Sequence, residues 1–145
     1  MSRTKKDNWI IYLLYFSWLT SFIAMLGSLY FSEVKGYIPC ELCWYQRILM
    51  YPFVLILGIA TFKKDISVIK YVLPLSIIGS LVSIMHYLEQ KKIIFFKIKP
   101  CVSQVPCDTI YINWFGFITI PFLAFIAFCI ISILLSIIAF KTRKH

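Results

Sequence analysis

The chain has 145 residues, of which 61% are hydrophobic and only 14% are charged, and its net charge is +9. A soluble domain has about a quarter of its residues charged, and one of this size could not hide so much apolar surface from water. The basic residues lie in short clusters between long apolar runs. This pattern argues against a nucleic-acid-binding surface and favours topogenic charge and contact with anionic membrane lipid.

Four apolar segments are long enough to cross a membrane as helices. They cover approximately residues 9–30, 44–62, 66–88 and 117–140. Each is close to the ~20 residues that a helix needs to cross the hydrocarbon layer. Backbone groups in lipid must also be hydrogen-bonded within the segment, which favours helices. We therefore predict an all-α integral membrane protein, a four-transmembrane-helix bundle that forms a single domain over residues 1–145.

The distribution of lysine and arginine predicts the orientation of these helices. With four spans, the N-terminal tail, the turn between spans two and three and the C-terminal tail share one side of the membrane. Basic residues are more numerous in these regions, which favours a cytoplasmic location for both termini. The basic residues predicted on the cytoplasmic side are Arg3, Lys5, Lys6, Lys63, Lys64, Lys70, Lys141, Arg143 and Lys144. Those predicted on the opposite side are Lys35, Lys91, Lys92, Lys97 and Lys99. We expect a multi-pass protein of the cell membrane with two extracytoplasmic, cysteine-bearing loops, on the side where disulfides form and persist.

The first loop ends in a C-x-x-C motif formed by Cys40 and Cys43. By itself this spacing is compatible with a zinc site, a structural disulfide or redox chemistry. Its position at the start of the second span places Cys43 at or near the first turn of a helix. The helix dipole and the free N–H groups there stabilise a thiolate, which is the reactive form of cysteine.

Arg47 follows Cys43 by four residues, so the two side chains share one helical face. A guanidinium stays charged and donates several hydrogen bonds, so that it can stabilise a thiolate or a reduced quinone. The alternative is an arginine that extends toward the lipid headgroups. The neighbouring C-x-x-C motif favours the functional interpretation.

The second loop carries Cys101 and Cys107, separated by five residues. A disulfide that only staples the loop is one interpretation, but a second pair on the same side of the membrane as the C-x-x-C motif favours a redox relay. Four cysteines can also bind zinc. The longer second spacing and the oxidising compartment argue against that site, and we expect no metal.

Two further residues lie within the apolar spans. His86 is near the outer end of the third span, where an ionisable side chain is a functional candidate that can bind a quinone carbonyl or transfer a proton. A histidine at the membrane interface is the equally weighted alternative. Cys129 is in the middle of the fourth span and is interpreted as a small apolar packing residue.

Several of these motifs resemble a known family. The run PCELCWYQR at 39–47 resembles the signature of the DsbB family of disulfide-forming membrane proteins. The run MHYLEQ at 85–90, the pair at 101 and 107, and YINWFG at 111–116 are similar to its BdbC branch from Gram-positive bacteria. The resemblance extends over nearly the whole chain.

The resemblance implies a four-helix protein-disulfide:quinone oxidoreductase. Such an enzyme reoxidises an extracytoplasmic thioredoxin-fold thiol oxidase of the DsbA or BdbD type and passes the electrons to the respiratory quinone pool. It further implies that Cys101 forms the mixed disulfide with the partner and that Cys107 completes that pair. Cys40 would exchange with the loop pair. Cys43 would contact the quinone, with Arg47 and His86 close to it.

The chain departs from the proteobacterial members of this family, in which a longer stretch separates the second cysteine pair. The Ile- and Lys-rich composition favours a Gram-positive source and therefore menaquinone, with ubiquinone as the alternative. Two other functions stay open at this point. One is a non-enzymatic membrane subunit whose disulfides hold its loops, and the other is an enzyme similar to vitamin K epoxide reductase.

Overall fold

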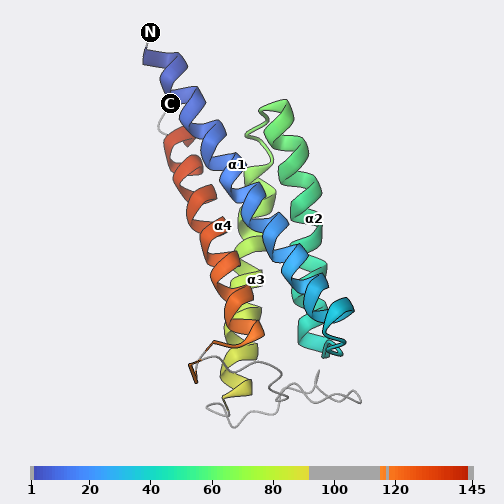
Figure 1. Ribbon diagram of the computed structural model, residues 1–145. Helices are drawn as coiled ribbons and strands as arrows, with labels where there is room; N and C mark the ends of the chain where they lie inside the picture. Colours follow the sequence, from blue (N-terminus) through green and yellow to red (C-terminus); the bar gives the residue numbers. More distant parts are fainter. Residues whose placement is uncertain (1, 92–114, 117, 144–145) are drawn as a thin grey trace.

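The computed structural model describes residues 2–91, 115–116 and 118–143, with side chains from residue 8 onward. Its elements are all helical: α1 (Ser2–Leu29), the π-helical turn η1 (Tyr30–Val34), α2 (Glu41–Lys63), α3 (Ile69–Gln90) and α4 (Ile120–Arg143). The helices run side by side (Figure 1). The beginning of α1 and the end of α4 lie at one end of the bundle, and the beginning of α2 and the end of α3 lie at the other.

All four helices are long and apolar enough to cross a membrane. Their most apolar stretches range in mean hydropathy from 1.5 in α2 to 3.0 in α4. Only 22–33% of the residues in these stretches are buried inside the bundle, so that the rest are at least partly exposed on its surface. This distribution suits a bundle whose solvent is lipid, and it confirms the predicted all-α class with four candidate membrane spans.

The helices pack as a bundle in which α1 and α3 each contact both α2 and α4. In its interior, the rings of Phe53 and Phe128 meet edge to face, with their centroids 6.2 Å apart. Gly79 of α3 makes this possible, because a Cβ atom at that position would lie 2.4 Å from the Phe128 ring. Small residues let neighbouring helices approach closely within a membrane. Ser132 of α4 also donates a hydrogen bond to Ser76 of α3, with the hydroxyl oxygens 2.9 Å apart.

The segment before α2 positions the C-x-x-C motif. Gly36 has a φ of +66°, which a residue without a Cβ adopts without strain. The chain then extends to Cys40, the N-cap residue of α2. Cys43 therefore lies in the first turn of the helix, as the sequence predicted. At the same end, Lys91 after α3 donates a hydrogen bond to the carbonyl of Gly116, shortly before α4.

Candidate redox site

The two cysteines of the C-x-x-C motif lie side by side at the start of α2. Both are free thiols, and their Sγ atoms are 3.3 Å apart, joined by an S–H···S hydrogen bond. Cys40 is buried, with 6% of its surface exposed, and Cys43 is partly buried. The pair is thus in its dithiol form, with the sulfurs close enough to form a disulfide after a small movement.

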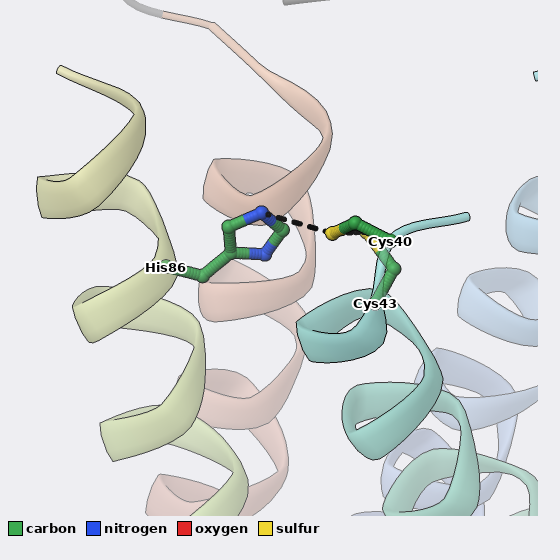
Figure 2. A group of neighbouring side chains, drawn as sticks. All are labelled: Cys40, Cys43 and His86. Atoms are coloured by element: carbon green, nitrogen blue, oxygen red, sulfur yellow. Dashed lines mark hydrogen bonds between the residues drawn. The ribbon is translucent and has the colours of Figure 1, made fainter. Parts of the chain in front are cut away.

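His86 reaches this pair from α3. The imidazole is 2% exposed, and its Nε2 atom lies 3.5 Å from Sγ of Cys40 (Figure 2). On the other side of the ring, Nδ1 lies 3.1 Å from the carboxamide nitrogen of Gln46, one turn along α2 from Cys43. The amide N–H donates to Nδ1, so the ring proton is on Nε2 and points at Cys40. Both ring nitrogens therefore contact side chains at the start of α2.

The hydrogen bonds around Cys40 favour its thiolate form. The hydrogen bond from the Cys43 thiol is the largest influence, and it lowers the pKa of Cys40 to about 4 together with the hydrogen bond from His86, although burial acts in the opposite direction. A thiolate is the form of cysteine that attacks disulfides. The sequence placed the stabilised thiolate at Cys43, whereas the hydrogen bonds of the folded site converge on Cys40.

Arg47 connects α2 with the end of α1. Its guanidinium donates to the carbonyl oxygen of Ser28 at 3.2 Å and to the hydroxyl of Ser32 at 3.5 Å. It also lies over the Trp44 ring, 5.8 Å from the centroid. The hydroxyl of Tyr51, one turn further along α2, donates to Oγ of Ser28 at 3.4 Å. These contacts hold the guanidinium within the protein and argue against an arginine that simply extends into the headgroups.

A cavity of about 490 Å³ lies beside the C-x-x-C motif, between α1, α2 and α4. Cys43, Gln46 and Arg47 are on its wall, so the predicted shared face of Cys43 and Arg47 opens into this space. His86 is not among the lining residues. Apolar side chains form most of the remaining wall, including Ile23, Ala24, Phe31, Ile38, Met50, Leu123, Ala127 and Ile130.

Comparison with known proteins gives the family. The family model described as "Disulfide bond formation protein DsbB" matches residues 11–138. The chain belongs to the DsbB family. The match includes both cysteine pairs, and it supports a membrane thiol-disulfide oxidoreductase over the two alternative functions considered from the sequence.

Curated DsbB-family relatives match along most of their length. The chain is 69% identical to "Disulfide bond formation protein C" of Bacillus subtilis over 88% of this chain and 93% of the relative. It is 55% identical to "Probable disulfide formation protein" of Oceanobacillus iheyensis, over 90% and 89% of the two chains. A protein of the same description from Coxiella burnetii is 50% identical over 92% of both chains. No solved structure gave a significant match.

The folded DsbB-family chain brings together four of the six predicted site residues, namely Cys40, Cys43, Arg47 and His86. The other two, Cys101 and Cys107, lie outside the described residues, and their roles stay predictions. The contact of His86 is with Cys40, and a role toward a quinone also stays a prediction for this residue.

Two residues of the site, Gln46 and Ser28, are not among the six predicted from the sequence. Gln46 is 6% exposed and contacts His86, and Ser28 accepts hydrogen bonds from two α2 side chains. A glutamine one turn from the second cysteine was a weak signal for a polar contact. Ser28 gave no signal, because its partners are 19 and 23 residues away in the sequence.

Proposed function

We propose that this DsbB-family protein reoxidises an extracytoplasmic thioredoxin-fold thiol oxidase and transfers the electrons to a membrane quinone. The observation that carries the proposal is the position of the Cys40–Cys43 dithiol. One side of the pair contacts His86, and on the other side Cys43 forms part of the wall of a mostly apolar cavity that also contains Gln46 and Arg47.

The cavity has the properties of a quinone site. Its volume of about 490 Å³ falls within the range of small-molecule pockets, which are apolar with a few placed polar groups. A quinone bound there supplies the oxidant and takes up two electrons and two protons. Arg47 and Gln46 are among the lining residues that can donate hydrogen bonds to its ring oxygens, while the apolar wall excludes water and accommodates a hydrocarbon chain. Menaquinone is the preferred candidate and ubiquinone the alternative.

The cysteines carry out two exchanges, each of which consumes one disulfide and one dithiol. A partner thiolate attacks the Cys101–Cys107 disulfide, and the second partner thiol completes the transfer, so that the partner leaves oxidised. A thiolate of the reduced loop pair then attacks Cys40 in the Cys40–Cys43 disulfide. Cys43 leaves as a thiolate at the start of α2, where the helix dipole stabilises negative charge. His86 holds a proton at Nε2, next to Cys40.

The proposal includes the orientation of the bundle across the cell membrane. The excess of basic residues at the end of the bundle where α1 begins and α4 ends supports a cytoplasmic location for both termini. The Cys40–Cys43 pair then lies near the extracytoplasmic surface, where an oxidising partner operates.

The test uses the full-length protein in detergent with a reduced thioredoxin-fold partner and a soluble menaquinone analogue. We expect quinone reduction, followed by absorbance, to match the loss of partner thiols at one quinone per two thiols. Cys43→Ala should reduce the rate to the uncatalysed level, because no second sulfur remains to close the disulfide. Cys129→Ala is the matched control, since Cys129 is a free cysteine on α4 that is not among the residues lining the cavity. Full quinone reduction by Cys43→Ala would refute the proposed path.

A further inference from the structure

The reduced C-x-x-C motif and His86 form a cluster with the dimensions of a metal site. Sγ of Cys40, Sγ of Cys43 and a ring nitrogen of His86 all lie within 4.8 Å of one another. The two sulfurs are 3.3 Å apart, and Nε2 is 3.5 Å from the nearer sulfur. Tetrahedral zinc, with bonds of about 2.3 Å to sulfur and about 2.0 Å to nitrogen, separates its ligand atoms by about 3.5–3.8 Å. The first two separations are within about half an ångström of these values, and the third, between Cys43 and His86, is at most 4.8 Å and closes by up to about an ångström when the Cys43 side chain turns toward the ring.

The outer contacts of this cluster also suit a metal ligand. A histidine that binds metal through one nitrogen usually hydrogen-bonds a polar group through the other. His86 directs Nε2 toward the sulfurs, and its Nδ1 lies 3.1 Å from the Gln46 carboxamide. Rotation of that carboxamide by half a turn presents its oxygen to an Nδ1–H group, which leaves Nε2 free to bind the ion.

The ligand set selects the class of ion. Two thiolates and an imidazole are ligands for zinc and similar thiophilic ions, whereas magnesium and calcium prefer oxygen. Two thiolates balance the charge of a divalent ion, which lowers the cost of placing it among the buried side chains of Cys40 and His86. Three protein ligands leave one position for an exogenous ligand. Cys43 lies on the cavity wall, so the cavity gives access to this position.

We propose that the reduced Cys40–Cys43 pair and His86 bind a divalent ion of the zinc class, and that oxidation of the pair abolishes the site. This site differs from the four-cysteine site that the sequence argued against, because its third ligand is a histidine 46 residues away in the chain. Binding transfers no electrons: the metal remains divalent, and each cysteine that enters as a thiol releases one proton. The bound ion holds both sulfurs apart as thiolates, so that it blocks disulfide formation.

The proposal goes beyond the quinone reaction and is tested without quinone or partner. The probe is Co²⁺, whose thiolate complexes absorb in the near ultraviolet and whose tetrahedral complexes show intense visible bands. The protein is full-length, in detergent, with Cys101→Ser, Cys107→Ser and Cys129→Ser, so that the C-x-x-C cysteines are the only two left of the five. We expect one Co²⁺ per reduced chain and displacement of the bands by Zn²⁺.

The reduced and oxidised forms of the same protein are compared, so that a folding defect in a variant cannot explain the result. After oxidation of the pair, the same protein should show no Co²⁺ bands. His86→Ala should weaken Co²⁺ binding by at least about tenfold and shift the visible bands, because a nitrogen ligand is lost. His145→Ala is the matched control, since the chain has only two histidines, and it should bind as the parent does.

Three results would overturn the metal site: no Co²⁺ bands in the reduced protein, equal binding after oxidation, or an unchanged spectrum in His86→Ala. None of them bears on the proposed quinone reaction, which is measured separately in metal-free protein. Conversely, Co²⁺ binding by a protein that fails to reduce quinone would support the metal site and refute only the proposed function.

Discussion

The end of the bundle that carries Cys40 and the middle of α2, α3 and α4 are built from different interactions. At the cysteine end, side-chain hydrogen bonds join His86 to α2 and Arg47 to α1, next to a cavity. In the middle, Phe53 and Phe128 are fully buried, and the Phe128 ring leaves no room for a Cβ atom at Gly79. The comparison shows that polar contacts place the reactive groups, whereas close apolar packing holds the helices on which they lie.

The largest expected effect concerns the charge of Cys40 at the polar end. In the reduced, metal-free protein, alkylation of Cys40 should be nearly independent of pH between 6 and 8. Its pKa of about 4 lies below that range, so the thiolate is already formed. Cys43→Ala removes the largest cause of the lowered pKa and should raise it. If it rises above 8, the alkylation rate falls about a hundredfold from pH 8 to pH 6, because the thiolate fraction drops tenfold per unit.

Mass spectrometry of the alkylated peptide measures this rate at Cys40 alone, and His145→Ala in the same protein is the control. A tenfold change per pH unit in the parent protein would contradict the hydrogen-bonding scheme of the site.

A substitution in the apolar middle of the bundle should change the stability of the protein. Gly79→Ala places a Cβ atom 2.4–2.7 Å from three atoms of the Phe128 ring, which cannot move away easily inside the bundle. We expect the free energy of unfolding to fall by about 1–3 kcal/mol, the usual cost of overpacking. Thermal unfolding in detergent, followed by circular dichroism, measures the change.

Gly27→Ala in α1 is the matched control for this substitution, because a Cβ atom there meets nothing within 4 Å. Its stability should be equal or up to about 1 kcal/mol higher, through the better helix propensity of alanine. Equal destabilisation by both variants would show that the Phe128 contact is not the cause.

The smallest expected effect comes from Gln46→Leu, which keeps the size of the side chain but removes the hydrogen bond to Nδ1 of His86. We expect quinone reduction to slow by roughly tenfold at most, as the loss of one such hydrogen bond is worth about 1 kcal/mol. Gln46 also lines the cavity, so turnover alone does not separate its two contacts. Alkylation of Cys40, which involves no quinone, should slow as well when it is measured near pH 4, where the thiolate fraction still depends on the pKa of Cys40. An unchanged alkylation rate would assign the effect to the cavity and not to His86.

The sequence by itself determined the helical class and the local part of the site. Each of the four apolar segments is long enough to cross the membrane. In lipid such a segment favours a helix, because the backbone must satisfy its own hydrogen bonds there. The Cys43-to-Arg47 spacing likewise fixes a shared helical face, which the structure directs into the cavity. Such inferences succeed because they depend on residues within one or two turns of each other.

The tertiary structure alone decided which distant groups meet. His86 lies 46 residues from Cys40 and 40 from Gln46, and Ser28 lies 19 residues before Arg47. These contacts depend on how the helices are rotated and shifted against one another. Apolar packing, such as that of Phe128 on Gly79, determines this arrangement. No local pattern encodes that packing, and so the sequence could name His86 as a candidate but could not place it against Cys40.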